Sequence, residues 1–592
     1  MPQASPLRAY NRLLLFVAGL GGLLYGVDVG IISGALPYLE ATSGFSSGQL
    51  SFVVAAVLLG TVISTVFAGL LADWLGRRRL MTASGLLFVA SIPMIALAPS
   101  YEALVCGRLL QGISGGLIGV VVPLYLAECL GAADRGKGTG IFQWLLTLGI
   151  VAAALIGMYF SYRVDQVAKL GDPARLLAFK DRAWRGMFWV SLPPGVLFVL
   201  GSFLVAESPR WLFRRGRREA AREALLRSRA PERAELELAE MAQTAAAGSA
   251  RSSAGRPAGQ DTLLRRKYVI PFLLACVILA CNQATGVNSI IGYNTTILLQ
   301  AGLSDVEAHW GYVILTLVNF LVTIAGVVLV DRKGRKFLLT LGSAGIIASL
   351  LAVGVLFRRT EARRIDCPAA VQALVGPDQR ATVPFRGPAA ASLLASAGDA
   401  GRSLALRPST LIVIYSYGDF RAATEVARSD DPDQKPIQIS RDACVPKNPV
   451  VAFFANPFGD QEAARAAPLR IENALVTPVP SDANGWMTAL GIYSFMAFFA
   501  IGPGVCVWLA LSELMPTRIR SNGMSFALLI NQAVSTVIAA TFLPTVGRYG
   551  YSTMFFAFAG CTVVYFLTAA FLLPETKGKT LEEIELHFEG AP

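Results

Sequence analysis

The sequence predicts an all-α membrane protein in which twelve transmembrane helices form two six-helix bundles. Of its 592 residues, 54% are hydrophobic and only 16% are charged, whereas soluble proteins carry about 25% charged residues. Apolar stretches recur that reach the roughly 20 residues a helix needs to cross a bilayer. Charged motifs in the first half of the chain also recur in the second half, which indicates two related bundles.

Twelve apolar stretches have spanning length. The first contains Asp28, continues past the length of a signal peptide and has no convincing cleavage site, so we expect it to remain as a membrane helix. The stretches lie near residues 12–34, 49–72, 80–98, 102–126, 139–160, 186–206, 268–296, 310–330, 337–357, 486–512, 521–545 and 551–573.

Basic loops orient the predicted helices. Most short basic segments fall on one side, which the positive-inside rule places in the cytoplasm together with both termini. The loop 161–185, with six Lys or Arg residues, is a local exception. The net charge of +12 favours anionic lipid head groups. Because the basic residues are spread over short loops, they do not form a nucleic-acid-binding surface. We therefore expect a multi-pass protein of the cell membrane.

Two pairs of motifs show the internal repeat. The motif DWLGRRR at Asp73 recurs as DRKGRK at Asp331, 258 residues later, and the acidic residue Glu128 recurs as Glu513, 385 residues later. The difference of 127 residues indicates an insertion between the eighth and tenth spans. Parallel halves of this kind are typical of the major facilitator architecture.

The repeat and the composition define five parts. The linker alternates Arg and Glu with Ala and Leu, a pattern of amphipathic helices at a membrane face. We assign 1–206 to an N-terminal six-helix bundle, 207–266 to cytoplasmic linker helices, 267–357 and 486–573 to a C-terminal six-helix bundle, 358–485 to a small extracytoplasmic α/β insertion, and 574–592 to a cytoplasmic tail.

The insertion contains strand-like runs that begin at Leu411, Val450 and Ile471. Of the eight cysteines, only Cys367 and Cys444 lie in it. An oxidising compartment would let them form a disulfide, and the alternative is two unpaired thiols. The other six cysteines lie in or beside spans as small apolar residues. Their spacing fits neither zinc nor haem, so we expect no metal and no cofactor.

Asp28 is the most informative residue of the first span. An aspartate at the centre of a membrane helix costs about 2.5–3.5 kcal/mol on insertion scales, and burial disfavours the charged form of a carboxyl group. Such a group can exchange a proton near neutral pH, so its presence favours proton-coupled transport.

Nine motifs in order resemble the sugar porter family of the major facilitator superfamily. They are GLLYGVDVGIISGAL in the first span, GRRR after the second, GRLLQGISGGL in the fourth, PLYLAECLGAADRGK (123–137), ESPRWL (207–212), QATGVNSI in the seventh, DRKGRK after the eighth, GPGVCVWLALSEL in the tenth and PETKG (574–578). The resemblance covers nearly the whole chain. It implies alternating access of two bundles around one central sugar site.

A sugar site needs neutral groups that both donate and accept hydrogen bonds, together with an aromatic face. Gln283 and Asn288 match the family's Q-x-x-G-x-N motif, and Asn282 stands where the family usually has a second Gln. The other candidates are Gln143, Asn319, Trp508 and Asn531. All of them except Asn319 match positions that contact sugar in the family. The alternative for each amide is a hydrogen bond between helices, and for Trp508 it is packing.

The resemblance also bears on Asp28, because proton-using sugar porters carry Asp at this position and facilitative glucose carriers carry Asn. It makes Arg108, at the start of GRLLQG, the expected partner. Arg stays charged, so it can pair with ionised Asp28 and separate from it on protonation. Our hypothesis is that the protonated, outward-facing protein binds sugar and that proton release to the cytoplasm accompanies inward opening. The alternative is a fixed structural ion pair.

Charged motifs on the cytoplasmic side form the last set of candidates. The resemblance implies salt-bridge networks that hold this side shut in the outward-open state, and the alternative is ordinary charges that set the topology. Their members are Asp73, Arg77, Glu128, Arg135, Glu207 and Arg210 in the first half, and Asp331, Arg335, Glu513, Arg520 and Glu575 in the second.

The sequence therefore predicts a monomeric transporter that imports a monosaccharide or inositol by proton symport across a lipid bilayer. The alternatives are facilitated diffusion without proton coupling, a sugar sensor and drug export by proton antiport. Asp28 argues against facilitated diffusion, and the short tail after the last span argues against a sensor. The QATGVN and PETKG motifs argue against drug export. No nucleotide-binding loop or nucleophile–base pair stands out, so we do not expect an enzyme.

Overall fold

The computed structural model describes residues 4–130, 135–253, 266–396, 398–424, 426–430, 435–447, 449, 452, 456, 459–515, 520–577 and 588. Within these ranges, twelve helical spans are long and apolar enough to cross a membrane. The predicted fold class, a twelve-helix membrane protein with a small α/β insertion, is confirmed.

The first half of the chain supplies six spans and three further helices. Ser46 and Ser100 are N-caps whose hydroxyl oxygens accept a hydrogen bond from the N–H three residues later. The sixth span is interrupted at Ser191, because Pro193 and Pro194 lack the backbone N–H of a continuous helix. The helices are α1 (Ala4–Ser43), α2 (Ser47–Leu75), α3 (Arg77–Ala96), α4 (Tyr101–Cys129), α5 (Arg135–Ala168), α6 (Pro173–Val190), α7 (Leu192–Leu204), α8 (Pro209–Arg214), α9 (Arg218–Ser228) and α10 (Pro231–Ser253).

Glycine and proline interrupt two spans of the second half. Gly286 separates α11 from α12 with a left-handed φ of +83°, which glycine adopts without strain. Gly502 and Pro503 separate α22 from α23. The helices are α11 (Arg266–Ala284), α12 (Val287–Gly292), α13 (Asn294–Gln300), α14 (Asp305–Lys333), α15 (Arg335–Glu361), α22 (Asp482–Ile501), α23 (Pro503–Leu514), α24 (Arg520–Tyr549) and α25 (Tyr551–Leu567), followed by a π-helix, η1 (Thr568–Leu572).

An antiparallel sheet forms the centre of the insertion. Its strand order is β1–β7–β3–β4, with β5 also paired to β3, and β2 and β6 form a separate ladder. Leu411, Val413 and Tyr415 of β3 are buried in the insertion's own hydrophobic core. The elements are β1 (Ile365–Asp366), α16 (Pro368–Gln372), β2 (Ala381–Val383), α17 (Gly387–Ala395), α18 (Asp399–Ala405), β3 (Ser409–Tyr417), β4 (Phe420–Ala423), β5 (Ala427–Arg428), β6 (Ile437–Ile439), α19 (Arg441–Cys444), α21 (Gln461–Ala466) and β7 (Leu469–Pro478).

Two of the three strand-like runs of the sequence become strands. The run at Leu411 lies in β3 and the run at Ile471 lies in β7. The run at Val450 falls largely outside the described residues.

The predicted disulfide between Cys367 and Cys444 is wrong. Both are free thiols. The Cys367 sulfur lies 3.4 Å from the carbonyl oxygen of Ala474 in β7, and the Cys444 sulfur lies 3.3 Å from that of Phe420 in β4. These contacts place the two cysteines beside opposite edges of the sheet. A disulfide requires Cα atoms within about 7 Å of each other, so the shared location of the two cysteines in the insertion was a misleading signal.

We expect both thiols to remain reduced and slow to react in the folded protein. Burial raises the pKa of each to about 11, and the thiolate is the reactive form. Alkylation at pH 8 without reductant is therefore expected to label Cys367 and Cys444 only after denaturation, as read by peptide mass spectrometry. A linked peptide pair in the unreduced digest would contradict this.

Glycines bring α1 close to α5. A Cβ added at Gly26 would lie 1.9 Å from the carbonyl oxygen of Leu146, and one at Gly149 would lie 2.3 Å from that of Leu23. Small residues of this kind let membrane helices pack backbone to backbone. The contact fixes the part of α1 that carries Asp28.

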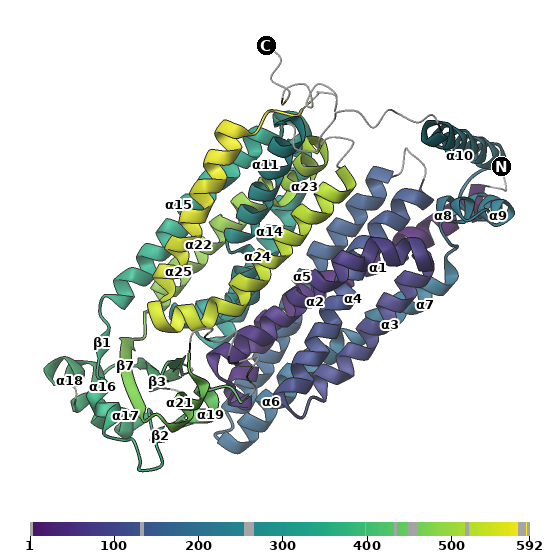
Figure 1. Ribbon diagram of the computed structural model, residues 1–592. Helices are drawn as coiled ribbons and strands as arrows, with labels where there is room; N and C mark the ends of the chain where they lie inside the picture. The colour runs from purple at the N-terminus through teal and green to yellow at the C-terminus, as the bar shows by residue number, and fades with distance from the viewer. Residues whose placement is uncertain are drawn as a thin grey trace.

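The linker helices and the insertion lie at opposite ends of the molecule (Figure 1). We call the end with α8–α10 the linker face and the end with the insertion sheet the insertion face. The helix ribbons of the two bundles lie close together toward the insertion face and diverge toward the linker face (Figure 1).

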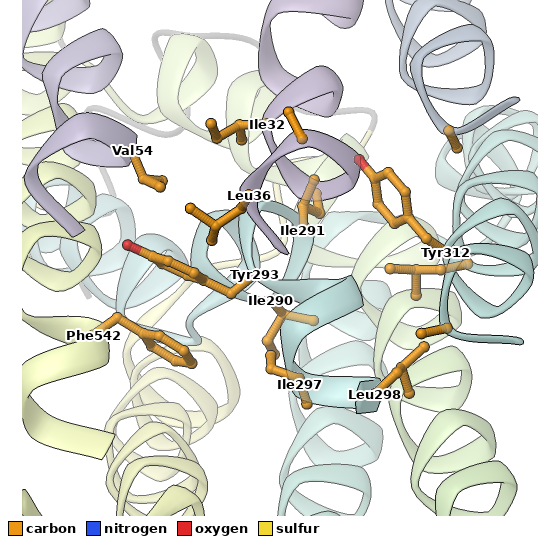
Figure 2. Packing of buried hydrophobic residues seen from close by; sticks show 14 of the residues in the cluster. Ile32, Leu36, Val54, Ile290, Ile291, Tyr293, Ile297, Leu298, Tyr312 and Phe542 are labelled. Atoms are coloured by element: carbon orange, nitrogen blue, oxygen red, sulfur yellow. The ribbon is translucent and has the colours of Figure 1, made fainter. Parts of the chain in front are cut away.

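Apolar side chains from both bundles pack together toward the insertion face. Figure 2 shows Leu36 of α1 and Val54 of α2 beside Tyr293 and Phe542. The rings of Tyr293, between α12 and α13, and Phe542, in α24, stack with centroids 4.5 Å apart. This cluster closes the contact between the bundles on that side.

Candidate functional site

Amide side chains from the seventh and eleventh spans form one hydrogen-bonded cluster. Asn288 Nδ2 donates to Gln283 Oε1 at 2.9 Å and to Ser535 Oγ at 2.7 Å. Gln283 Nε2 donates to Asn531 Oδ1 at 3.2 Å, and Asn531 Nδ2 donates to the carbonyl of Leu279 at 3.0 Å. The cluster spans the helix break at Gly286. It joins α11, α12 and α24.

Burial differs within this amide cluster. Asn531 and Ser535 are buried, whereas Gln283 and Asn288 are only partly buried. The two buried residues fix the positions of the two more accessible amides. The accessible amides therefore present donors and acceptors in a set geometry, as recognition of a neutral polyhydroxylated ligand requires.

The other amide candidates lie apart from this cluster. Asn282 is buried, and its Nδ2 lies 3.5 Å from the carbonyl of Pro503 at the break of the tenth span. Gln143 on α5 is exposed and Asn319 on α14 is partly buried. Their neighbours Trp144 and Phe320 touch across the bundles, with ring centroids 5.6 Å apart. The side chain of Trp508 lies outside the described residues.

Asp28 and Arg108 face each other inside the N-terminal bundle. Both are only 1% exposed, and Arg108 Nη1 lies 3.6 Å from Asp28 Oδ1. That distance is an ion-pair contact, longer than a hydrogen bond. Among the described residues, neither carboxyl oxygen of Asp28 has a hydrogen-bond partner. A buried carboxylate normally needs such partners, so the site suits a carboxyl group that changes its protonation state.

Gln111 is a second partner of Arg108 that the sequence reasoning missed. Arg108 Nη1 donates to Gln111 Oε1 at 2.6 Å, and the guanidinium carbon lies 5.5 Å from the centre of the Phe188 ring. Gln111 lies three residues after Arg108, the helical spacing that brings side chains together. This spacing was the available signal.

The comparison with family models decides the family. The model of the "Sugar (and other) transporter" family matches residues 14–373 and 471–588. The chain belongs to this family. The segment between the two matched ranges, residues 374–470, falls within the insertion, so the family model does not cover most of the insertion.

Individual members of the family extend the likeness over nearly the whole chain. The galactose-proton symporter of Escherichia coli K12 is 26% identical over 583 residues, with 98% of this chain and 94% of that protein covered. The human proton myo-inositol cotransporter is 27% identical over 585 residues, with 98% and 82% covered. A partially occluded inward open structure of the xylose transporter XylE from E. coli shares the fold, with a TM-score of 0.63, 20% identity, and 97% and 100% of the two chains covered.

Each half of this transporter holds a glutamate against the start of a helix on the linker face. Glu207 Oε1 accepts hydrogen bonds from the N–H groups of Arg77 and Arg78 at 2.9 and 3.0 Å. In the second half, Glu575 accepts from the N–H groups of Arg335 and Lys336 at 3.1 and 3.2 Å. A carboxylate satisfies the unpaired N–H groups and the dipole of a helix start. The two halves thus share the same feature, a glutamate that caps the start of a helix.

Glycine makes this approach of the glutamates possible. Gly76 and Gly334 precede the two helices with φ of +98° and +90°. A Cβ at either position would lie 2.5 Å from a carboxyl oxygen of Glu207 or Glu575. These glycines are the G of the GRRR and GRK motifs.

Arg77 is the centre of the ionic network in the first half. It is buried, its Nη1 lies 2.9 Å from Asp73 Oδ1, and its Nε lies 2.8 Å from Glu128 Oε2. Ser208 Oγ also donates to Glu128. Arg214, which the sequence reasoning did not select, reaches Glu128 Oε1 at 3.3 Å.

The remaining network candidates differ in position. Arg210 is exposed and has no ion pair within the described part of the chain, where Arg214 of α8 makes the contact with Glu128. The side chains of Arg135, Asp331, Glu513 and Arg520 lie outside the described residues.

The bundles are joined at the insertion face. Ser33 Oγ and Thr295 Oγ1 lie 3.2 Å apart, Tyr312 Oη donates to the carbonyl of Gly30 at 3.0 Å, and the N–H of Leu543 donates to Ser51 Oγ at 3.1 Å. At the linker face, each ionic network between described residues stays within its own half.

Proposed function

We propose that the protein imports a monosaccharide or polyol by proton symport, through alternating access of its two bundles. The observation that carries the proposal is the buried Asp28 carboxyl group, which lies 3.6 Å from Arg108 and has no hydrogen-bond partner among the described residues. A carboxyl group in this position gains little from staying ionised unless Arg108 approaches it. Proton binding and the position of Arg108 are therefore coupled.

Gln111 provides the second position for Arg108. When Asp28 is ionised, the guanidinium is drawn toward the carboxylate. When Asp28 is protonated, Arg108 keeps its 2.6 Å hydrogen bond to Gln111 and releases α1 from α4. The two arrangements differ in the helix contacts they stabilise, so protonation biases a two-state equilibrium. Protonation then favours sugar binding from outside, and proton release to the cytoplasm accompanies inward opening.

The amide cluster is the proposed sugar site. Gln283 and Asn288 present their amides beside the break at Gly286, while Asn531 and Ser535 hold them in place. The family relatives named for galactose, myo-inositol and xylose support a ligand with several hydroxyl groups. We propose that Asn282, Gln143, Asn319 and Trp508 complete the site as the bundles close around the ligand.

The linker face is proposed to be cytoplasmic, with both termini on that side, because the basic loops gather there. Contacts between the bundles at the insertion face and separate ionic networks at the linker face then correspond to an inward-facing state. In the opposite state, the networks around Arg77 and Arg335 are proposed to join across the linker face. We propose that a monomer performs the whole cycle, because one chain supplies both bundles.

Uptake into proteoliposomes tests the function. Labelled galactose, glucose, xylose, arabinose and myo-inositol are offered with and without an acid-outside pH gradient. We expect one of them to accumulate above its outside concentration only with the gradient. Uptake that stops at equal concentrations under both conditions would identify a uniporter, and binding without any flux would identify a sensor.

A further inference from the structure

Asp305, the first residue of α14, reaches out of its own bundle. Its Oδ2 accepts a hydrogen bond from Tyr38 Oη of α1 at 2.6 Å and another from Ser161 Oγ of α5 at 2.6 Å. Tyr38 is 2% exposed and Ser161 is fully buried. One carboxylate oxygen of the C-terminal bundle therefore joins two helices of the N-terminal bundle.

His309 strengthens the same junction. It lies one turn after Asp305, is fully buried and stacks on the Tyr38 ring, with centroids 5.6 Å apart and planes 10° apart. Its Nδ1 lies 2.8 Å from the carbonyl oxygen of Asp305, and its Nε2 lies 3.3 Å from that of Gly34 on α1. The histidine thus holds the Tyr38 ring in the position from which its hydroxyl donates to Asp305.

The Asp305 junction differs chemically from the other contacts between the bundles. Those contacts are apolar packing or hydrogen bonds among hydroxyl, histidine and backbone groups. Within the described ranges, Asp305 is the acidic residue whose side-chain hydrogen bonds cross between the bundles. Hydrogen bonds to an ionised group are about twice as strong as those between neutral groups. They are also directional, so a small separation of the helices breaks them.

We propose that Asp305 is the polar latch of the insertion face: its carboxylate holds α1 and α5 against α14, and both bonds must break before that face can open. The latch rests on the proposed alternating-access function, but not on proton coupling or on the identity of the sugar. Asp305 is a positioning residue, since it sets the balance between the two states without touching the substrate.

A matched pair of variants tests the latch. Asp305→Asn keeps the shape of the side chain and removes its charge. Glu307→Gln removes a charge from the same first turn of α14, where Glu307 hydrogen-bonds to the N-cap Ser304 and contacts Trp486 of its own bundle. Both variants change the helix dipole interaction similarly. Only Asp305→Asn alters the contact between the bundles.

The readout is the distance between spin labels on the two bundles. Labels are placed at Gln166→Cys on α5 and Ala483→Cys on α22, both exposed, after the exposed Cys106 and Cys561 are replaced by Ser. We expect Asp305→Asn to raise the ratio of long to short distances at least tenfold. We also expect it to lower the KM for substrate offered at the insertion face, because the state that binds it is more populated.

Two results would overturn the latch. One is an unchanged distance distribution in Asp305→Asn. The other is the same shift in Glu307→Gln, which would assign the effect to charge at the helix start. Should Asp305→Asn fail to fold, Tyr38→Phe and Ser161→Ala each remove one donor and are expected to give smaller shifts in the same direction. Because distances are measured without a proton gradient, a failure of proton symport would leave this result interpretable.

Discussion

Replacing Asp28 by Asn is expected to abolish accumulation of sugar against its gradient while exchange of sugar between the two sides continues. Asn matches Asp in shape and resembles the protonated carboxyl group, but it cannot release a proton. Arg108 then has no charge to return to and keeps its hydrogen bond to Gln111. The variant can still carry bound sugar in both directions, but the proton gradient no longer drives it.

The measurement compares gradient-driven uptake with counterflow in the same proteoliposomes. One pH unit supplies about 1.4 kcal/mol per proton, enough for roughly tenfold accumulation by the wild type. We expect the accumulation ratio of Asp28→Asn to fall to about one, with counterflow retained. The control is Glu102→Gln, which removes an exposed acid from the first turn of α4 and is expected to leave accumulation intact. An Asp28→Asn protein that still concentrates sugar would refute the coupling role.

The fold was predictable because membrane insertion imposes strict rules on the sequence. Each span must be long and apolar, so the twelve stretches read from composition correspond to the twelve spans observed. The two repeats, of DWLGRRR and of Glu128, have different offsets, and this difference located the insertion. Residues inserted between two copies of a motif lengthen the offset by the same number. Strand β3 was visible as a run of β-branched and aromatic residues, and β7 as an apolar run that includes Ile471 and Val476.

Contacts that depend on the tertiary fold were less predictable. The cysteine pair was inferred from the compartment and from the location of both residues in the insertion, and neither observation reports that Cys367 and Cys444 lie beside opposite edges of the sheet. Arg214 and Arg210 are one helical turn apart and lie on nearly the same face of α8, so the choice between them depended on where along the axis of α8 Glu128 is met. Ser535 has no motif of its own. Its role follows from lying one turn after Asn531 on α24.

Asp305 shows the same limit in another way. In the sequence it is an ordinary acid in the first turn of a helix, where acids are common because of the helix dipole. Glu307, two residues later, fits that description and forms a capping box with Ser304. Only the packing of α14 against α1 and α5 separates the two acids. The helix-dipole rule therefore accounts fully for Glu307, but it gives no sign that Asp305 contacts the other bundle.

The proposed proton site and the proposed latch share one helix. Asp28 and Tyr38 are both on α1, ten residues or about 15 Å apart. The close packing of Gly26 and Gly149 fixes α1 to α5, which also carries Ser161. A change of the Asp28–Arg108 contact that shifts α1 against α4 would therefore also displace both donors to Asp305. If both proposals hold, this arrangement links proton binding mechanically to the insertion face.

The amide cluster leads to the second large expected effect. Replacing Gln283 by Ala is expected to raise the KM for sugar roughly tenfold, with a smaller change in turnover. The substitution removes both a donor and an acceptor from the accessible part of the cluster, and it leaves Asn531 Oδ1 and one hydrogen of Asn288 without their partners. A lost hydrogen bond costs about 0.5–1.5 kcal/mol, and an unsatisfied buried partner costs about 1–3 kcal/mol more. The matched control is Gln532→Ala, which truncates an amide at the neighbouring position of α24 and is expected to change KM by less than about twofold.

Deoxysugars decide whether Gln283 touches the ligand or only orders its neighbours. For the wild type, the analogue that lacks the contacted hydroxyl is expected to bind more weakly than the parent sugar. For Gln283→Ala, the two sugars are expected to bind equally, because the contact is already lost. This comparison is a double-mutant cycle in which one change lies on the ligand. If every deoxysugar loses as much affinity with Gln283→Ala as with the wild type, then Gln283 acts only through Asn288 and Asn531, and the sugar contacts must come from other side chains.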